Sequence, residues 1–215
     1  VVPKYRLSYI MGNPPFVGAN NLSKEQKNEI LEICGDEIDK GGLLDYVSAW
    51  YIKASRLINN TNVRAAFVST NSITQGEQVA GVWKPLYDRF GIHIDFAHRT
   101  FRWDSEASLK AHVHCVIVGY SCAANSEPKR LYDNERLLLV ENINAYLVDA
   151  INTFIDSRNK PLCAVPDMRS GGKPVEGGNL IFTEEEKAAF LMIEPKAEIY
   201  FRPFMGSDDF INGHG

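Results

Sequence analysis

The feature of this sequence that most constrains its fold is an alternation of helix-like and strand-like segments. The run VRAAFVST, residues 63–70, is apolar at most positions, which is typical of a strand buried on both faces of a parallel sheet. The segment 43–58, before this run, has apolar residues at helical spacing, and we expect a further helix over 77–89, after it. Strands that alternate with helices in this way predict an α/β fold.

Two strand-like segments then follow one another with no helix between them. IHIDFAH (92–98) and AHVHCVIVGY (111–120) predict an antiparallel hairpin at one edge of the sheet. Nearer the start of the chain, residues 7–11 form a short apolar strand. Ser23 followed by Gln26 is a capping-box signal for a helix.

The character of the sequence changes after Tyr120, where SCAANSEPKR is polar and turn-prone. Beyond this stretch we expect a helix over 143–157 and a further helix that opens at Thr183, which three glutamates follow. The change in character predicts two regions, a sheet domain over 1–122 and a linker with a second domain over 123–215.

Composition narrows the class of protein. The 215 residues have a formal net charge of −4, so the chain as a whole is not strongly basic, although local basic patches remain compatible with DNA binding. No apolar run approaches the length of a membrane span.

His112 and His114 share a strand face without a third ligand nearby, so we expect no metal site. The cysteines form no C-x-x-C pair and are expected to be reduced cytoplasmic thiols: Cys34, Cys115, Cys122 and Cys163.

The most informative local motif is Asn13-Pro14-Pro15-Phe16, which directly follows the first strand. Ligands of open α/β sheets bind beyond the carboxyl ends of strands, and two prolines stiffen such a loop and remove two backbone donors. The Asn13 side-chain oxygen and the Pro14 carbonyl are then two fixed acceptors, which suit an exocyclic amino group. Phe16 adds a flat face for a heteroaromatic ring. The alternative is a rigid Pro-Pro turn with a core phenylalanine.

Several stretches, taken together, resemble one enzyme family. GNPPF resembles motif IV of the adenine-N6 DNA methyltransferases that use S-adenosylmethionine. LLDYVSAWYIKAS resembles the helix that follows this motif, VRAAFVSTNSITQGEQV resembles motif VI, and FRWDSEASLKAHVHCVIVGY resembles motif VIII. With PDMRSGGKPVEGGNLIFTEEE and FRPFMGSDDFING, these stretches closely resemble MmeI-like type II restriction–modification enzymes.

This resemblance implies a fold and a reaction. The fold is the C-terminal half of a Rossmann-like S-adenosylmethionine-dependent methyltransferase sheet, followed by part of a mixed α/β target recognition domain. The implied partner is double-stranded DNA, from which an adenine is flipped out. Asn13 and Pro14 would accept the two N6 hydrogens and Phe16 would stack on the base. Phe101 and Trp103 occupy the place of the aromatic that sandwiches the base, with core packing as the alternative.

Other candidate residues have an equally good structural explanation. Asp45 and Tyr46 could line the cofactor side, or serve as a helix N-terminal acid and a core aromatic. Arg169 and Lys173 could contact DNA phosphates, or belong to an ordinary solvated loop. Asn71 and Gln75 follow the end of a central strand, where they could face a ligand or form a turn and helix cap.

The chain also differs from the family pattern at its start. It begins VVPKYRLSY, without methionine, and no glycine-rich cofactor loop follows an earlier strand. We therefore expect a fragment that is inactive by itself and binds S-adenosylmethionine weakly or not at all, with residues 7–11 as an exposed sheet edge that self-associates. The expected location is the bacterial cytoplasm. The alternatives are a non-enzymatic DNA-binding or interaction fragment, or a methyltransferase that acts on RNA or protein glutamine.

Overall fold

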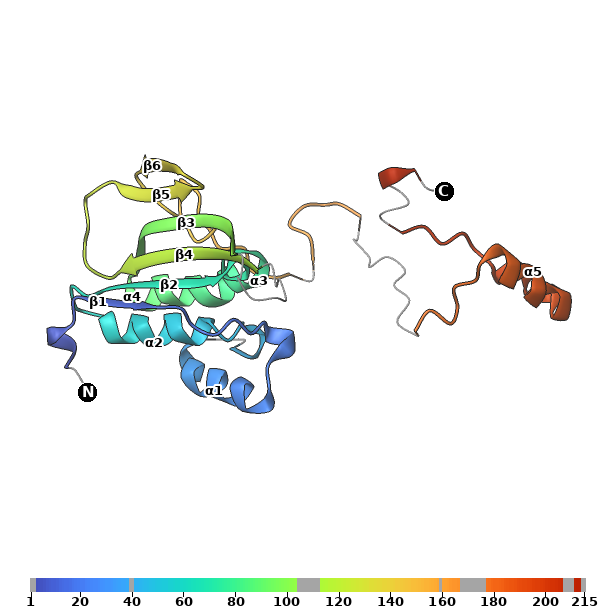
Figure 1. The fold of residues 1–215 in the computed structure, drawn as a ribbon, viewed down its shortest axis with the longest axis horizontal. Coiled ribbons are helices and arrows are strands. Elements are labelled where there is room, and N and C mark those ends of the chain that lie inside the picture. Colours follow the sequence, from blue (N-terminus) through green and yellow to red (C-terminus); the bar gives the residue numbers. More distant parts are fainter. Residues whose placement is uncertain are drawn as a thin grey trace. The chain divides into compact units, whose positions relative to one another are not determined.

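The computed structural model describes residues 3–38, 41–103, 113–158, 160–166, 177–206 and 211–213. The chain divides into two compact units, Val1–Arg158 and Asn159–Gly215 (Figure 1). The first unit extends beyond the boundary expected at residue 122, because the strands that follow this point continue the sheet of the first unit.

The first unit is built on a six-stranded mixed sheet of order β1-β2-β4-β3-β5-β6. Parallel pairs join β1 to β2 and β3 to β5, while β4 runs antiparallel to both β2 and β3, and β6 antiparallel to β5. The expected α/β fold is confirmed. The strand bounds are β1 Tyr9–Gly12, β2 Arg64–Thr70, β3 His93–Trp103, β4 Val113–Ser121, β5 Lys129–Asp133 and β6 Arg136–Val140.

The expected hairpin forms between β3 and β4, but it lies inside the sheet and not at its edge. The hairpin at the edge is β5–β6, which the sequence analysis did not identify. A two-residue turn, Asn134-Glu135, connects these strands, and Asn134 has a φ of 54°. Asparagine tolerates this left-handed conformation, which two-residue hairpin turns require.

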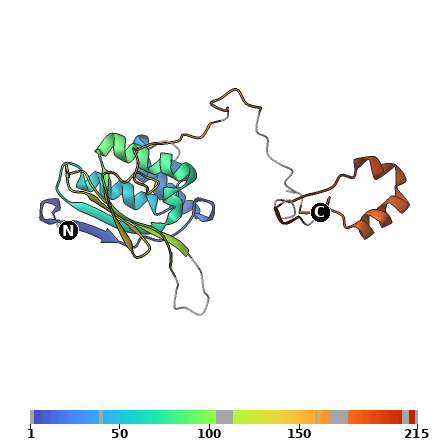
Figure 2. The ribbon, with the colours of Figure 1, turned by 90° about the horizontal axis from the view of Figure 1, so that it is seen from above.

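The helices of the first unit agree with the predicted spacing, with one change of boundary. Figure 2 shows α2 and α4 on one face of the sheet. The helix expected over 43–58 begins only at Ser48, after a 3-10 turn at Gly41–Leu43. The Ser23–Gln26 capping box is confirmed. The α-helices are α1 Lys24–Cys34, α2 Ser48–Ile58, α3 Gly76–Gln78 and α4 Lys84–Phe90, with a π-helical turn Val79–Trp83 joining the last two and 3-10 turns at Lys4–Arg6, Ala19–Asn21, Gly35–Glu37 and Asn71–Thr74.

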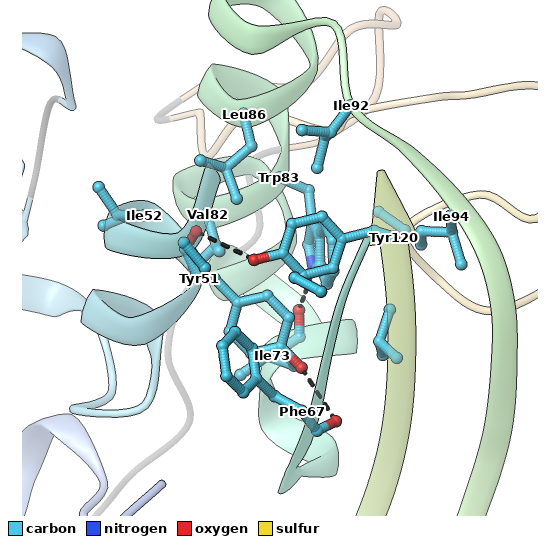
Figure 3. Packing of buried hydrophobic residues seen from close by; sticks show 14 of the residues in the cluster. Tyr51, Ile52, Phe67, Ile73, Val82, Trp83, Leu86, Ile92, Ile94 and Tyr120 are labelled. Atoms are coloured by element: carbon cyan, nitrogen blue, oxygen red, sulfur yellow. Dashed lines mark hydrogen bonds between the residues drawn. The ribbon is translucent and has the colours of Figure 1, made fainter. Parts of the chain in front are cut away.

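The core lies between the sheet and these helices; it is largely aliphatic, and four buried aromatic rings contact one another within it (Figure 3). The Tyr51 ring meets Phe67 and Trp83 edge-on at centroid distances of 5.2 and 5.3 Å, and it stacks on Tyr120 at 5.6 Å. Tyr51, Trp83 and Tyr120 are fully buried. Edge-on and offset contacts of this kind add to the free energy gained by burying the rings.

The polar atoms of these rings all have partners inside the core. Tyr120 donates to the Tyr51 carbonyl at 3.2 Å, and the Tyr51 hydroxyl lies 2.7 Å from Ser69 Oγ. Trp83 Nε1 donates to the Ile73 carbonyl at 2.8 Å, which fixes the turn after β2 to the helical segment that follows it. Burial raises the pKa of Tyr51 well above its usual range, so this hydroxyl stays protonated.

The helix expected over 143–157 does not form, and that prediction was wrong. The Asn144 side-chain oxygen accepts from the backbone N–H groups of Tyr146 and Val148, at 3.0 and 3.3 Å, and Leu147 has a φ of 56°. A side chain that bonds to the backbone in this way replaces the helical hydrogen bonds, so the segment forms turns against the core.

The second unit contains α5, Glu184–Ile193, and a 3-10 turn, Pro195–Tyr200. The predicted helix start is confirmed, because Thr183 and Glu186 form a capping box. Phe182 packs edge-on against Phe190 and Phe201, at centroid distances of 5.5 and 5.3 Å. In the described parts of both units, helices are too short or too polar to cross a bilayer.

Candidate active site

The carboxyl ends of β1, β2 and β3 lie along the same edge of the sheet, because these three strands run in one direction. Gly12, the last residue of β1, pairs with Phe67 of β2. Three residues further along β2, Thr70 pairs with Cys115, which also pairs with Phe101 of β3. The loop after β1, the turn after β2 and the end of β3 therefore share one edge, as ligand-binding loops of open α/β sheets do.

The loop Asn13-Pro14-Pro15-Phe16 begins where β1 ends. Pro14 is buried, Phe16 is half-buried, and Asn13 and Pro15 are exposed. Among the described residues, neither the Asn13 side-chain oxygen nor the Pro14 carbonyl has a hydrogen-bond partner in the protein. Two neighbouring acceptors without partners form an arrangement that an amino group with two N–H donors can satisfy.

A cavity of about 890 Å³ borders this loop. Its walls come from β1, α1, α2 and the loop itself, and Asn13, Pro14 and Tyr46 all line it. Most of the lining is apolar, while Glu29 and Lys53 supply charge. A largely apolar wall with a few polar groups is typical of small-molecule sites.

Tyr46 and Asp45 differ in their surroundings. The Tyr46 hydroxyl donates to Glu29 on the cavity wall, and this hydrogen bond raises the pKa of Tyr46. Asp45 is 8% exposed, and both its carboxylate oxygens have partners within the protein: Oδ1 accepts from Ala19 N at 2.8 Å and Oδ2 accepts from the Ser72 hydroxyl. Tyr46 therefore lines the cavity, whereas Asp45 is buried, is hydrogen-bonded to Ala19 and Ser72, and is not among the described residues that line the cavity.

Phe101 and Trp103 lie at the end of β3, with ring centroids 6.2 Å apart. Phe101 is half-buried and Trp103 is 44% exposed, so neither ring is a fully buried core residue. Three strand spacings separate β3 from β1, which is roughly 14 Å. Both rings thus lie at the same edge of the sheet as Asn13, but the ends of β2 and β4 lie between them and Asn13.

The remaining predicted residues are only partly described. Asn71 is half-buried and its carbonyl accepts from the Thr74 hydroxyl at 2.8 Å, while Gln75 is exposed. His114 is exposed on β4. Among the described residues, no cluster of three metal-ligating side chains occurs. His112, Arg169 and Lys173 lie outside the described residues, so the predicted phosphate contacts of Arg169 and Lys173 stay predictions.

Two partners of Asp45, Ser72 and Gln78, were not predicted from the sequence. The backbone N–H of Asp45 donates to Gln78 Oε1 at 3.2 Å, and Gln78 Nε2 donates to the Leu43 carbonyl at 2.7 Å. Ser72 and Gln78 are 27 and 33 residues from Asp45 in the sequence. No local sequence pattern predicts contacts over such separations. The only indication in the sequence is that Ser72 and Gln78 follow a strand expected to be central in the sheet.

Two family models match the chain. The model of the MmeI DNA-methyltransferase domain covers residues 2–133, more than half of the chain, and that of the MmeI target recognition domain covers residues 149–215. The chain therefore belongs to the MmeI family of DNA methyltransferases. Its first unit carries the methyltransferase domain of that family, and its second unit belongs to the target recognition domain.

Similar proteins agree with this assignment. The chain is 42% identical over 205 residues to DNA methyltransferase A of Bacillus subtilis, covering 95% of this chain and 23% of the relative. It is 45% identical to the Type IIL restriction-modification enzyme MmeI, solved in complex with DNA, with a TM-score of 0.88 over 97% of this chain and 28% of that one. The chain thus spans about a quarter of the length of the relatives it matches.

Proposed function

We propose that the full-length protein carrying this chain is an adenine-N6 DNA methyltransferase of a restriction–modification system. The observation that carries the proposal is the pair of partnerless acceptors, the Asn13 side-chain oxygen and the Pro14 carbonyl, at the carboxyl edge of the sheet. Membership of the MmeI family supports DNA as the substrate. MmeI itself was solved in complex with DNA.

In this proposal the chain's own residues position the reacting amine. Asn13 and Pro14 accept the two N6 hydrogens of a flipped-out adenine and so direct the nitrogen lone pair away from the loop. Phe16 stacks on the base and holds its plane. The attacking amine is neutral, so no base of perturbed pKa is needed before attack, and positioning supplies much of the acceleration.

S-adenosylmethionine, the general methyl donor of such enzymes, supplies an electrophilic methyl group on a sulfonium. The cavity that borders Asn13 and Pro14 supports this choice, since its volume lies within the range of roughly 300–1,000 Å³ for small-molecule sites. Tyr46 and Glu29 are among the polar groups on its wall that could contact the cofactor.

The test is methyl transfer from labelled S-adenosylmethionine to duplex DNA by the full-length protein, followed by identification of the modified base. N6-methyladenine at a fixed sequence supports the proposal. Methylated cytosine, or label found only on RNA or protein glutamine, contradicts it. Specific DNA binding without any transfer would favour the alternative of a non-enzymatic DNA-binding protein.

Phe16→Ala in the full-length protein is expected to weaken capture of the flipped base by about 1–3 kcal/mol, because one stacking face is lost. The measurement is the fluorescence of 2-aminopurine at the target position, which rises when the base leaves the stack. Phe90→Ala, which removes a half-buried ring at the end of α4 in the first unit, is the matched control for loss of a phenylalanine. An unchanged fluorescence response in Phe16→Ala would exclude Phe16 as the stacking residue.

We also propose self-association of this 215-residue chain through β1. Arg64 N donates to the Ser8 carbonyl at 3.1 Å, and backbone groups alternate in direction along a strand, so those of Tyr9 and Met11 face the open edge. The side chains of Tyr9 and Met11 are 65% and 79% exposed. An exposed edge strand with apolar side chains tends to pair with another copy.

Met11→Lys is expected to shift the isolated chain from oligomer to monomer, since a charge on an edge strand opposes edge-to-edge pairing. Light scattering over a concentration series measures the mass. Leu139→Lys, at the opposite edge on β6, is the matched control and should leave the mass unchanged. A wild-type chain that is monomeric throughout the series contradicts self-association.

A further inference from the structure

The carboxylate of Asp45 joins segments that are distant in sequence. Its Oδ1 accepts from Ala19 N at 2.8 Å, and Ala19 follows the Asn13–Phe16 loop by three residues. Its Oδ2 accepts from the hydroxyl of Ser72, in the turn that directly follows β2. One buried side chain thus connects the loop after β1 with the turn after β2.

The backbone around Asp45 reinforces this connection. Tyr46 N donates to the Val17 carbonyl at 2.9 Å, so residues 45 and 46 hold two successive parts of the loop. The Asp45 N–H donates to Gln78 Oε1 at 3.2 Å, which fixes Asp45 to the helical segment beyond the turn. Trp83 in turn donates to the Ile73 carbonyl, so the turn that carries Ser72 is itself anchored in the core.

We infer that Asp45 is a positioning residue, which sets the Asn13–Phe16 loop relative to the end of β2 without contacting the cofactor or the base. The inference rests on the proposed methyltransferase function for its catalytic consequence. Because both carboxylate oxygens are engaged by Ala19 and Ser72, Asp45 acts through these hydrogen bonds. A displacement of about 1 Å at reacting groups can cost about 10²-fold in rate, so loss of the anchor should lower turnover.

The hydrogen bonds of the Asp45 side chain predict different effects for different substitutions of this residue. In Asp45→Asn the side-chain oxygen can still accept from Ala19 N, while the amide donates to Ser72 Oγ. The Ser72 hydroxyl can then donate to Thr70 Oγ1, which lies 2.8 Å away. An asparagine side chain can therefore form hydrogen bonds with both Ala19 and Ser72 without carrying a charge, whereas an alanine side chain can form neither.

The test compares Asp45→Ala, Asp45→Asn and Ser72→Ala in the full-length protein, with Glu141→Ala as a control for loss of an exposed acid. We expect Asp45→Ala to lower kcat by about 10- to 100-fold with KM for S-adenosylmethionine changed less than about threefold. Asp45→Asn should recover most of the turnover. The kcat of Ser72→Ala should lie between those of Asp45→Ala and Asp45→Asn. If Asp45→Ala fails to fold, the test compares the kcat of Asp45→Asn and of Ser72→Ala with that of the wild type.

A second readout separates this inference from the proposed function. Amide hydrogen exchange of peptides covering residues 13–21 should be faster in Asp45→Ala and Ser72→Ala than in wild type, and unchanged in Glu141→Ala, whether or not the protein methylates DNA. If the wild-type protein does not methylate DNA but exchange is still faster in Asp45→Ala and Ser72→Ala, the proposed function alone is refuted. Wild-type exchange in Asp45→Ala, or a rise in KM for S-adenosylmethionine shared by Asp45→Ala and Asp45→Asn, would overturn the positioning role.

Discussion

Asn13→Ala in the full-length protein is expected to lower the rate of methyl transfer by about 10²–10³-fold or more, a loss comparable to removal of one preorganised hydrogen-bonding group from an active site. The substitution removes the exposed side-chain oxygen that has no partner among the described residues. In the proposed reaction this acceptor acts mainly at the reacting nitrogen, so kcat should fall while the affinity for DNA stays close to that of wild type. Single-turnover methylation and a DNA-binding titration measure the two quantities.

The matched control is Asn20→Ala, which removes another exposed asparagine a few residues further along the same segment. It should methylate DNA at the wild-type rate. Near-normal turnover in Asn13→Ala would refute the acceptor role of Asn13. An equal loss in Asn13→Ala and Asn20→Ala would show that the segment tolerates no substitution, and the specific role of Asn13 would again be refuted.

Trp83→Ala is expected to lower the free energy of unfolding of the first unit by about 3–5 kcal/mol, as large-to-small substitutions of buried aromatic residues do. Trp83 is fully buried and contacts the rings of Tyr51 and Tyr120. The substitution also leaves the Ile73 carbonyl without its donor, which adds the cost of an unpaired buried acceptor.

Urea unfolding followed by tryptophan fluorescence measures this loss in the 215-residue chain. All three tryptophans, Trp50, Trp83 and Trp103, lie in the first unit, so the signal reports that unit. Trp50→Ala is the matched control, because Trp50 is 45% exposed on α2, and it should cost about 1 kcal/mol or less. Equal losses in both variants would contradict the assignment of Trp83 to the core.

Local patterns in the sequence were sufficient where the physical cause is itself local. A continuous apolar run predicted β2, and apolar residues at helical spacing predicted α2, because burial on a helix face repeats every 3.6 residues. The capping box at Ser23 and the helix start at Thr183 were also predicted, since the hydrogen bonds that cap these helices span three residues. The position of the Asn13–Phe16 loop followed from the strand before it.

Local patterns failed where a side chain replaced the backbone hydrogen bonds of a helix, or where a strand depends on its partners in the sheet. Residues 143–157 have an apolar content that suits a helix, yet Asn144 takes the N–H groups of Tyr146 and Val148, and the helix does not form. The short strands β5 and β6 gain their stability from pairing with β3 and with each other, which no single segment reveals. Gly119 in β4 is explained only by Phe96 of β3, whose ring lies 2.0 Å from where a Cβ would stand.

The sequence by itself determined the chemistry of the candidate site: two acceptors and a ring on a stiff loop after a strand, within a chain of one recognisable family. The tertiary structure alone decided how that loop is held. Asp45 reaches back to Ala19 and forward to Ser72, over separations of 26 and 27 residues. Such contacts depend on how β1, β2 and α2 pack, and packing brings together residues that no sequence spacing relates.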